Sequence, residues 1–230
     1  GQLATETLER ARAQVASAVG AEAEHIVTFV SGATEGIGQV VASIAPGRVL
    51  VSAVEHVAVH AAVEARDDLV VESIAVDSAG QVLIDPLRRQ LRDGTPPSAV
   101  MVMAANNETG VIQPIGELVP ELKARGIPMV VDATQFIGRL PMHHALPDYL
   151  ILTGHKLGGP KGVGAIVSHQ DAPLAAIIRG GGQEGGRREG TEPLPAIAGF
   201  GAAMEIVEAE RLSESSRLSR LREGVAKVLL

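Results

Sequence analysis

The chain has 230 residues, of which 46% are hydrophobic and 20% are charged, a composition typical of a globular protein with a buried core. The net charge of −7 and the aromatic content of 2% argue against nucleic-acid binding. The chain has no excess of basic residues to neutralise phosphates and few aromatic side chains on which bases could stack. The absence of cysteine excludes disulfides, thiolate metal sites and a cysteine nucleophile within these residues. We find no apolar run of membrane-spanning length and no leader-like start, so we expect a cytoplasmic protein without a membrane partner.

Apolar spacing predicts helices that alternate with short strands. The predicted helices are, in chain order, residues 3–19, 33–45, 56–67, 85–92, 114–125 and 195–210, with another from residue 212 onward. The predicted strands are residues 26–30, 48–53, 69–76, 81–84, 99–104, 127–131, 149–152 and 164–167. Asp85 and Pro86 suit the N-cap and first position of the fourth helix, and Gly20 suits the end of the first. The alternation predicts an α/β fold: a mainly parallel sheet with helices on both faces.

Polar residues that a surface turn would not need follow several of the predicted strands. They are Gly32, Ala33 and Thr34, then Glu55 and His56, then Asn106, Asn107 and Glu108, then Asp132 and Gln135, and finally Thr153, Gly154, His155 and Lys156. Each group alone is ambiguous, since an Asp after a strand or a Thr at a strand-to-helix turn is often only a helix cap. Ligands of such sheets bind at the carboxyl ends of the strands, so we expect these residues to line one pocket.

Lysine, carboxylate, imidazole and hydroxyl groups, without cysteine or metal, suit pyridoxal phosphate, which needs an amine for a Schiff base, an acid facing the pyridine nitrogen and a phosphate cradle. The chain has four lysines, and we interpret Lys123 and Lys227 as solvated. Lys156 follows a predicted strand beside a Gly-rich bend, where we expect a desolvated amine. Lys161 is the rival, interpreted as a loop-shaping surface residue.

Six motifs occur in a fixed order at residues 29–35, 53–59, 106–115, 131–135, 153–162 and 180–191. Together they resemble the motifs of cysteine desulfurases in the class V aminotransferase group of fold-type I pyridoxal-phosphate enzymes. The resemblance extends from near residue 1 to about residue 205, and it implies that residues 1–205 form a large domain that binds pyridoxal 5′-phosphate.

The resemblance also implies a role for each matching residue. Lys156 would form the Schiff base, Asp132 would face the pyridine nitrogen, and His56 would stack on the ring. Thr191 would reach the phosphate from the other subunit, which implies a homodimer. The remaining implied cofactor-binding residues are Ala33, Thr34, Asn107, Gln135, Thr153 and His155.

The activity implied by the resemblance is the conversion of L-cysteine to L-alanine, with sulfur passed to an acceptor or scaffold protein for iron–sulfur cluster assembly or tRNA thiolation. The sulfur-accepting cysteine and a substrate-binding arginine of this family lie in a C-terminal small domain. We therefore expect the chain to be a fragment, with residues 206–230 forming a helical segment that leads toward that domain. Two alternatives stay open: another class V enzyme, such as an aminotransferase or selenocysteine lyase, and a non-catalytic cofactor-binding scaffold.

A metal site is the weaker interpretation of the histidines. His56 and His60 have ligand spacing on a predicted helix, but the sequence offers no evident third ligand. We expect no metal, and we interpret His143 and His144 as surface residues. Glu189 departs from the resemblance, because a small residue is frequent at that position.

Overall fold

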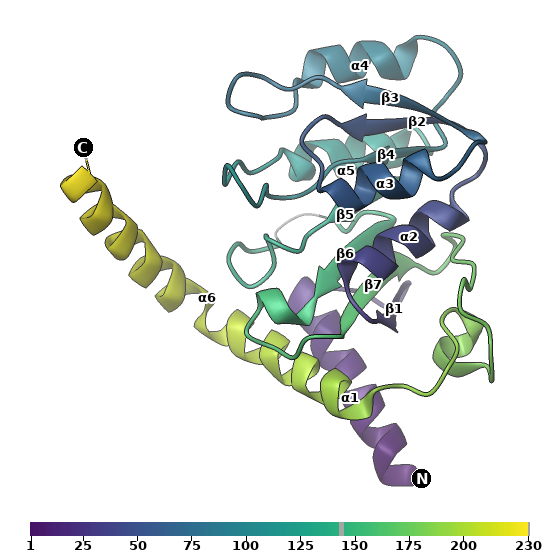
Figure 1. The fold of residues 1–230 in the computed structure, drawn as a ribbon, viewed down its shortest axis with the longest axis vertical. Coiled ribbons are helices and arrows are strands. Elements are labelled where there is room, and N and C mark those ends of the chain that lie inside the picture. The colour runs from purple at the N-terminus through teal and green to yellow at the C-terminus, as the bar shows by residue number, and fades with distance from the viewer. Residues whose placement is uncertain (143–144, 230) are drawn as a thin grey trace.

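Seven strands form one sheet within residues 1–142 and 145–229, the part of the chain that the computed structural model describes (Figure 1). They are β1 (His25–Val30), β2 (Gly47–Ser52), β3 (Leu69–Ile74), β4 (Ala99–Met101), β5 (Met129–Asp132), β6 (Tyr149–Thr153) and β7 (Gly164–His169). Their order is β1-β7-β6-β5-β4-β2-β3, and every pairing is parallel except those that β7 makes with β1 and β6. This confirms the predicted α/β fold with a mainly parallel sheet. His143 and His144 lie outside the described residues.

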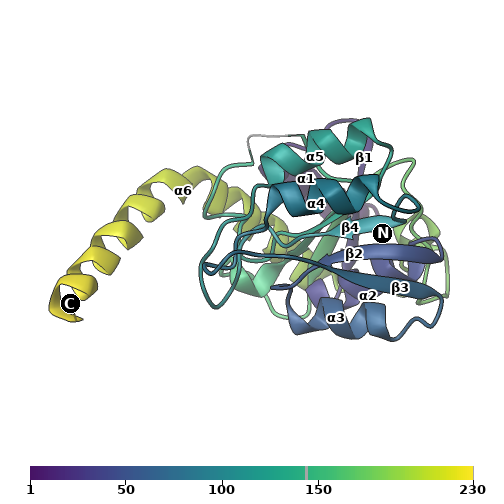
Figure 2. The same cartoon turned by 90° about the horizontal axis from the view of Figure 1, so that it is seen from above.

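Helices cover both faces of the sheet (Figure 2). They are α1 (Gln2–Val19), α2 (Ala33–Ser43), α3 (Val57–Glu64), α4 (Ile84–Arg92), α5 (Ile115–Ala124) and α6 (Leu194–Leu229), with short 3-10 helices η1 (Gly154–Lys156) and η2 (Gln183–Gly186). Helices α1, α4 and α5 lie over one face, where Leu87 and Leu118 are buried, and α2 and α3 lie over the other, where Val40 and Val63 are buried. Burial of apolar side chains on both faces explains why the strand sequences are almost continuously apolar.

One C-terminal helix, α6, replaces the two helices that we predicted. Its first turns pack against α1 and bury Ile197, Phe200 and Met204, whereas its later part extends away from the sheet (Figure 1). The prediction of a break near residue 211 is wrong because no glycine or proline occurs there and an Arg211–Glu208 ion pair supports the helix. Among the described helices, none is long and apolar enough to cross a membrane.

The segment before α4 also differs from its prediction. Residues 81–84 do not form a strand, and a single isolated bridge joins Val82 to Val76. Helix α4 begins at Ile84, because the carbonyl of Leu83 accepts the first helical N–H, so Asp85 lies inside the first turn and does not cap it. The end of α1 is as predicted: Gly20 adopts φ 68°, a left-handed conformation that glycine reaches without a steric penalty.

Candidate active site

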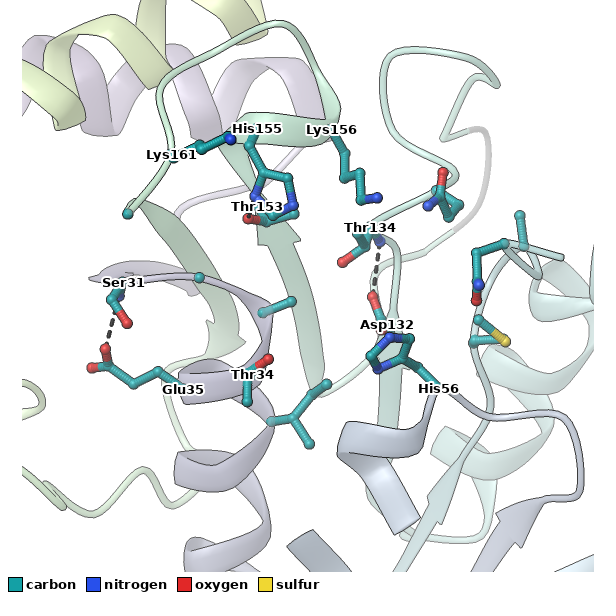
Figure 3. Close-up of a pocket in the computed structure, with 18 residues that line it drawn as sticks. Ser31, Thr34, Glu35, His56, Asp132, Thr134, Thr153, His155, Lys156 and Lys161 are labelled. Carbon is teal, nitrogen blue, oxygen red and sulfur yellow. Dashed lines mark hydrogen bonds between the residues drawn. The ribbon is translucent and has the colours of Figure 1, made fainter. Parts of the chain in front are cut away.

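A cavity of about 620 Å³ lies at the carboxyl ends of the parallel strands (Figure 3). Its lining includes the implied catalytic and cofactor-binding residues apart from Thr191: Ala33, Thr34, His56, Asn107, Asp132, Gln135, Thr153, His155 and Lys156. Of the other residues expected at the strand ends, Gly32 lines the cavity, whereas Glu55, Asn106, Glu108 and Gly154 do not. Parallel strands that end at one edge bring these loops together although they are distant in sequence. The expectation of one shared pocket is therefore confirmed for this set.

The start of α2 forms one side of the cavity. Gly32 is its N-cap and supplies no side-chain cap, and the backbone N–H groups of Ala33 and Thr34 have no hydrogen-bond partner among the described residues. Free N–H groups at the positive end of a helix dipole form a favourable environment for an anion.

A carboxylate close to this helix start is held by other partners. Glu35 accepts hydrogen bonds from the Ser31 N–H and from Arg188 Nε, each at 2.9 Å. Burial raises the pKa of Glu35, but the bonds from Arg188 and Ser31 outweigh it, and the pKa lies below its usual value. The arginine compensates the negative charge of Glu35, so that charge opposes an anion at the α2 start less strongly.

Two residues at the end of β6 face the same region. The Thr153 hydroxyl lies 3.0 Å from His155 Nδ1 and 3.4 Å from the Val163 carbonyl oxygen. Thr153 is buried, whereas His155 is exposed at the cavity rim. Because a hydroxyl both donates and accepts, Thr153 orients the imidazole toward the side of the cavity that contains α2 (Figure 3).

Two lysines line the cavity. Lys156 ends the 3-10 helix that follows β6, and its amine points toward Thr134 and Asp132, whereas Lys161 lies near His155 (Figure 3). The expectation that Lys156 is desolvated is wrong, because η1 places it at the open rim, where it is exposed. Lys161 is exposed as expected, yet its position on the cavity was not anticipated.

Asp132, the last residue of β5, provides the buried carboxylate of the site. It is 8% exposed, its Oδ1 accepts the Thr134 N–H at 2.9 Å, and no ion pair to it occurs in the part of the chain that the structure describes. A buried carboxylate without a cation is costly, so the cavity favours a cationic or N–H-bearing group beside Asp132.

His56 is the N-cap of α3, not its first helical residue as predicted. Its Nδ1 accepts the Ala58 N–H at 3.1 Å, which requires that Nδ1 carry no proton. The neutral ring then carries its proton on Nε2. Figure 3 shows the His56 imidazole beside Asp132. The cavity therefore has a flat ring next to a buried carboxylate.

The two asparagines after β4 have different surroundings. Asn106 is used internally: its Nδ2 donates to the Val54 carbonyl at 3.0 Å, and its Oδ1 accepts the N–H groups of Glu108 and Thr109, both at 2.9 Å. Asn107 lines the cavity and is exposed. The loop therefore directs only the second asparagine toward a ligand.

Thr191 does not line the main cavity. It is exposed and lies on a neighbouring cavity of about 260 Å³, which shares Ser31 and Gly162 with the larger one. The Gly-rich segment before it is anchored by Glu184, whose oxygens accept Arg12 Nη1 and Nη2 at 2.9 Å. The predicted contact of Thr191 with a second subunit stays a prediction.

Sequence reasoning missed one functional candidate whose signal was available. Thr134 lies between Asp132 and Gln135, and its buried Oγ1 has no hydrogen-bond partner among residues 1–142 and 145–229. An unpaired buried hydroxyl at a cavity indicates a position for a ligand. Elsewhere in the described chain, no group of three or more His, Asp or Glu side chains is arranged to hold a metal ion.

The cavity residues fit the chemistry of pyridoxal phosphate. The α2 start offers unpaired N–H groups for a phosphate, Asp132 is a buried carboxylate without a cation for a pyridinium, and Thr134 has an unpaired hydroxyl. Lys156 adds an amine on the same cavity.

Comparisons with known proteins identify the family. A model of the family described as aminotransferase class-V matches residues 1–228. A cysteine desulfurase from Frankia sp. is 43% identical over 237 residues, which cover 94% of this chain and 56% of that protein.

Solved structures agree. The X-ray structure of a NifS-like protein from Rickettsia africae has a TM-score of 0.92 and 31% identity, covering 100% of this chain and 65% of that one. A structure of SspA in complex with cysteine has a TM-score of 0.78 and 29% identity, covering 89% and 61%. The chain thus spans less than two thirds of each of these three proteins. It belongs to the aminotransferase class-V family.

Proposed function

We propose that this chain is the cofactor-holding part of a pyridoxal-phosphate-dependent cysteine desulfurase, which converts L-cysteine to L-alanine and transfers the sulfur to an acceptor. The observation that carries the proposal is the convergence of Lys156, Asp132, His56 and the uncapped α2 start on one cavity. The named function of the Frankia relative and the cysteine bound to SspA support the reaction and its substrate.

Each cavity residue has a task in this proposal. When bound, pyridoxal phosphate supplies a ring that accepts electrons from the bonds of the substrate's α-carbon. Lys156 Nζ would hold the cofactor aldehyde and move the α-proton of the substrate, and Asp132 would hold the ring N–H. His56 would stack on the ring, and its Nε2, which Ala58 leaves free, is the atom available to a substrate thiol.

The phosphate and the ring substituents have candidate partners too. The phosphate would bind the N–H groups at the start of α2 and three side chains: Thr34, Thr153 and His155. Gln135 and Asn107 would contact the ring hydroxyl and the substrate carboxylate. In a homodimer, Thr191 of one protomer would reach the phosphate of the other.

The sulfur acceptor must come from outside this sequence, which contains no cysteine. In the proposed reaction the C–S bond of L-cysteine breaks and an acceptor thiol becomes a persulfide. We assign that thiol to a small domain beyond residues 206–230, and the next acceptor to a protein of iron–sulfur assembly or tRNA thiolation, in the cytoplasm. The proposed large domain, residues 1–205, ends within α6, which continues without a break.

The test uses the protein expressed from its complete reading frame and loaded with pyridoxal phosphate. Borohydride reduction followed by peptide mass spectrometry is expected to find the cofactor on Lys156, and L-cysteine is expected to yield alanine. Lys156→Ala is expected to lose the visible absorption band of the lysine-bound cofactor and at least about 10³-fold in activity, whereas Lys161→Ala retains the band. A band that survives Lys156→Ala would contradict the assignment, and alanine formation from L-selenocysteine but not L-cysteine would favour a selenocysteine lyase.

A further inference from the structure

Glu55 is a buried carboxyl that none of the roles above uses. It is 9% exposed, follows β2 and immediately precedes His56. No Arg, Lys or His within the described residues forms an ion pair with it. A carboxyl in this setting needs a structural or chemical reason, because its burial is costly.

The backbone of the neighbouring strand explains what Glu55 contacts. Pairing between β4 and β5 continues past Met101: the Val102 N–H donates to the Val130 carbonyl at 3.1 Å, and the Ala104 N–H donates to the Asp132 carbonyl at 2.8 Å. Successive N–H groups of a strand point to opposite sides, so the N–H of residue 103 points toward β2, the other neighbour of β4.

At this level β2 has already ended at Ser52, and a side chain takes its place. Glu55 Oε1 accepts the Met103 N–H at 2.6 Å, which supplies the acceptor that a longer β2 would have provided. A second bond, from Asn106 Nδ2 to the Val54 carbonyl at 3.0 Å, holds the same turn. We call residues 99–106, which are β4 and its continuation, the β4 segment. The two bonds hold the turn that carries His56 against this segment.

The pKa of Glu55 depends on its burial and on the neighbouring Asp132. Burial, and then the negative charge of Asp132, raise the pKa of Glu55 to about 8, although hydrogen bonds from the Met103 N–H and Ser52 act in the opposite direction. Among the described residues, the charged group that acts on Glu55 is Asp132 from β5, and the other groups that contact it are the Met103 N–H and Ser52. His56 is the next residue of the same turn. With its pKa near 8, Glu55 keeps its proton at neutral pH.

We propose that Glu55, in its uncharged form, is a positioning residue that braces the His56 turn against the β4 segment and adds no negative charge beside Asp132. The inference rests on the proposed function, because a fixed imidazole and an undisturbed Asp132 side chain matter for holding the cofactor. When Glu55 ionises, two carboxylates share one buried region without a cation from the described chain, and the bracing of His56 weakens.

The protein expressed from its complete reading frame tests this with two variants. Glu55→Gln keeps an oxygen for the Met103 N–H but cannot ionise, and Glu55→Leu removes the acceptor. The first measurement is thermal and denaturant unfolding without cofactor, from about pH 5 to about pH 9. The second is the visible spectrum and the affinity for pyridoxal phosphate over the same range.

The expected sign follows from the raised pKa. The unfolded state releases the Glu55 proton near the ordinary value of 4.5 and the folded state only near 8, so wild-type stability falls as pH rises through this window. Glu55→Gln should match wild type near pH 5 and exceed it above pH 8, by up to about 10³-fold in the unfolding equilibrium constant. Its cofactor spectrum should lack a transition near pH 8 that wild type shows. Glu55→Leu should bind the cofactor roughly 10-fold more weakly at all these pH values.

Four outcomes overturn the inference or separate it from the proposed function. Parallel pH profiles for wild type and Glu55→Gln would overturn it, as would full cofactor affinity in Glu55→Leu. A wild type that never shows the cofactor band refutes the proposed function, while the cofactor-free unfolding profile still decides the charge of Glu55. Should Glu55→Gln not fold, infrared spectroscopy of wild type decides: a protonated-carboxyl band present at neutral pH and lost near pH 8 supports the inference, and its absence overturns it.

Discussion

The Gly-rich segment at residues 180–190 and the cavity at the strand ends differ in whether their polar groups have partners within the protein. In the Gly-rich segment four polar side chains are paired within the protein: Gln183, Glu184, Arg188 and Glu189. The Glu184 side chain, 2% exposed, accepts two bonds from Arg12 and one from the Phe29 N–H at 2.8 Å. Gln183 Oε1 likewise accepts the Gly190 N–H at 2.8 Å.

The cavity contains groups that the described residues leave without partners. Asp132 has no cation, Thr134 Oγ1 has no hydrogen bond, and the N–H groups of Ala33 and Thr34 are free. Buried polar groups are nearly always satisfied in folded proteins. The paired groups therefore hold distant segments together, whereas the unpaired groups are available to a ligand.

Among the variants that compare these two regions, the largest effect is expected from Asp132→Asn, which replaces the buried carboxyl of the cavity. We expect a loss of roughly 10²- to 10³-fold in turnover, and unchanged or higher stability without cofactor, because an unpaired buried charge is removed. Alanine formation and cofactor-free thermal unfolding measure the two effects. The matched control is Asp148→Asn, since Asp148 binds the Met129 N–H at the opposite end of β5. Equal activity losses in both variants would contradict a specific role for Asp132 at the cavity end of β5.

An effect on stability, not on activity, is expected from Glu184→Gln. The change leaves the partly buried Arg12 without its buried partner, so we expect the free energy of unfolding to fall by about 3 kcal/mol and the unfolding midpoint by roughly 6–12 °C. Glu9→Gln removes the exposed partner of the same arginine and should cost less than about 1 kcal/mol. Similar midpoints for the two variants would show that the buried pair does not anchor the Gly-rich segment.

The smallest expected effect separates two unpaired hydroxyls. Thr134→Val should weaken pyridoxal-phosphate binding by about 5- to 10-fold, because it removes a hydroxyl that faces the cavity. Thr28→Val changes an equally unpaired hydroxyl in the core of β1 and should raise stability by about 1 kcal/mol without affecting cofactor affinity. Titration of the visible band and denaturant unfolding distinguish them, and identical responses would contradict a ligand-binding role for Thr134.

Much of the site could be predicted because its members share a local signature. Ala33, His56, Asp132 and Lys156 each follow an apolar strand, and parallel strands end at one edge of the sheet. Exposure could not be predicted in the same way. Lys156 follows a strand as expected, but the 3-10 turn places it at the rim, a geometry that composition does not encode.

Element boundaries failed where local signals competed. Asp85 and Pro86 form a convincing helix start, yet the turn closes earlier on the Leu83 carbonyl. Near residue 211 the sequence contains polar residues but no helix breaker, so α6 continues through the predicted gap.

The sequence alone was enough to predict the fold class, the alternation of strands and helices, and most of the residues that line the cavity, because periodicity and strand direction are local properties of the chain. The tertiary structure alone decided which distant groups pair. Glu55 meets the Met103 N–H across 48 positions, and Arg12 meets Glu184 across 172. The Glu55 bond depends on the strand order, in which β2 lies beside β4 although β3 comes between them in the sequence. The physical reason is that hydrogen bonds and charges act between atoms close in space, and no local pattern specifies those distances.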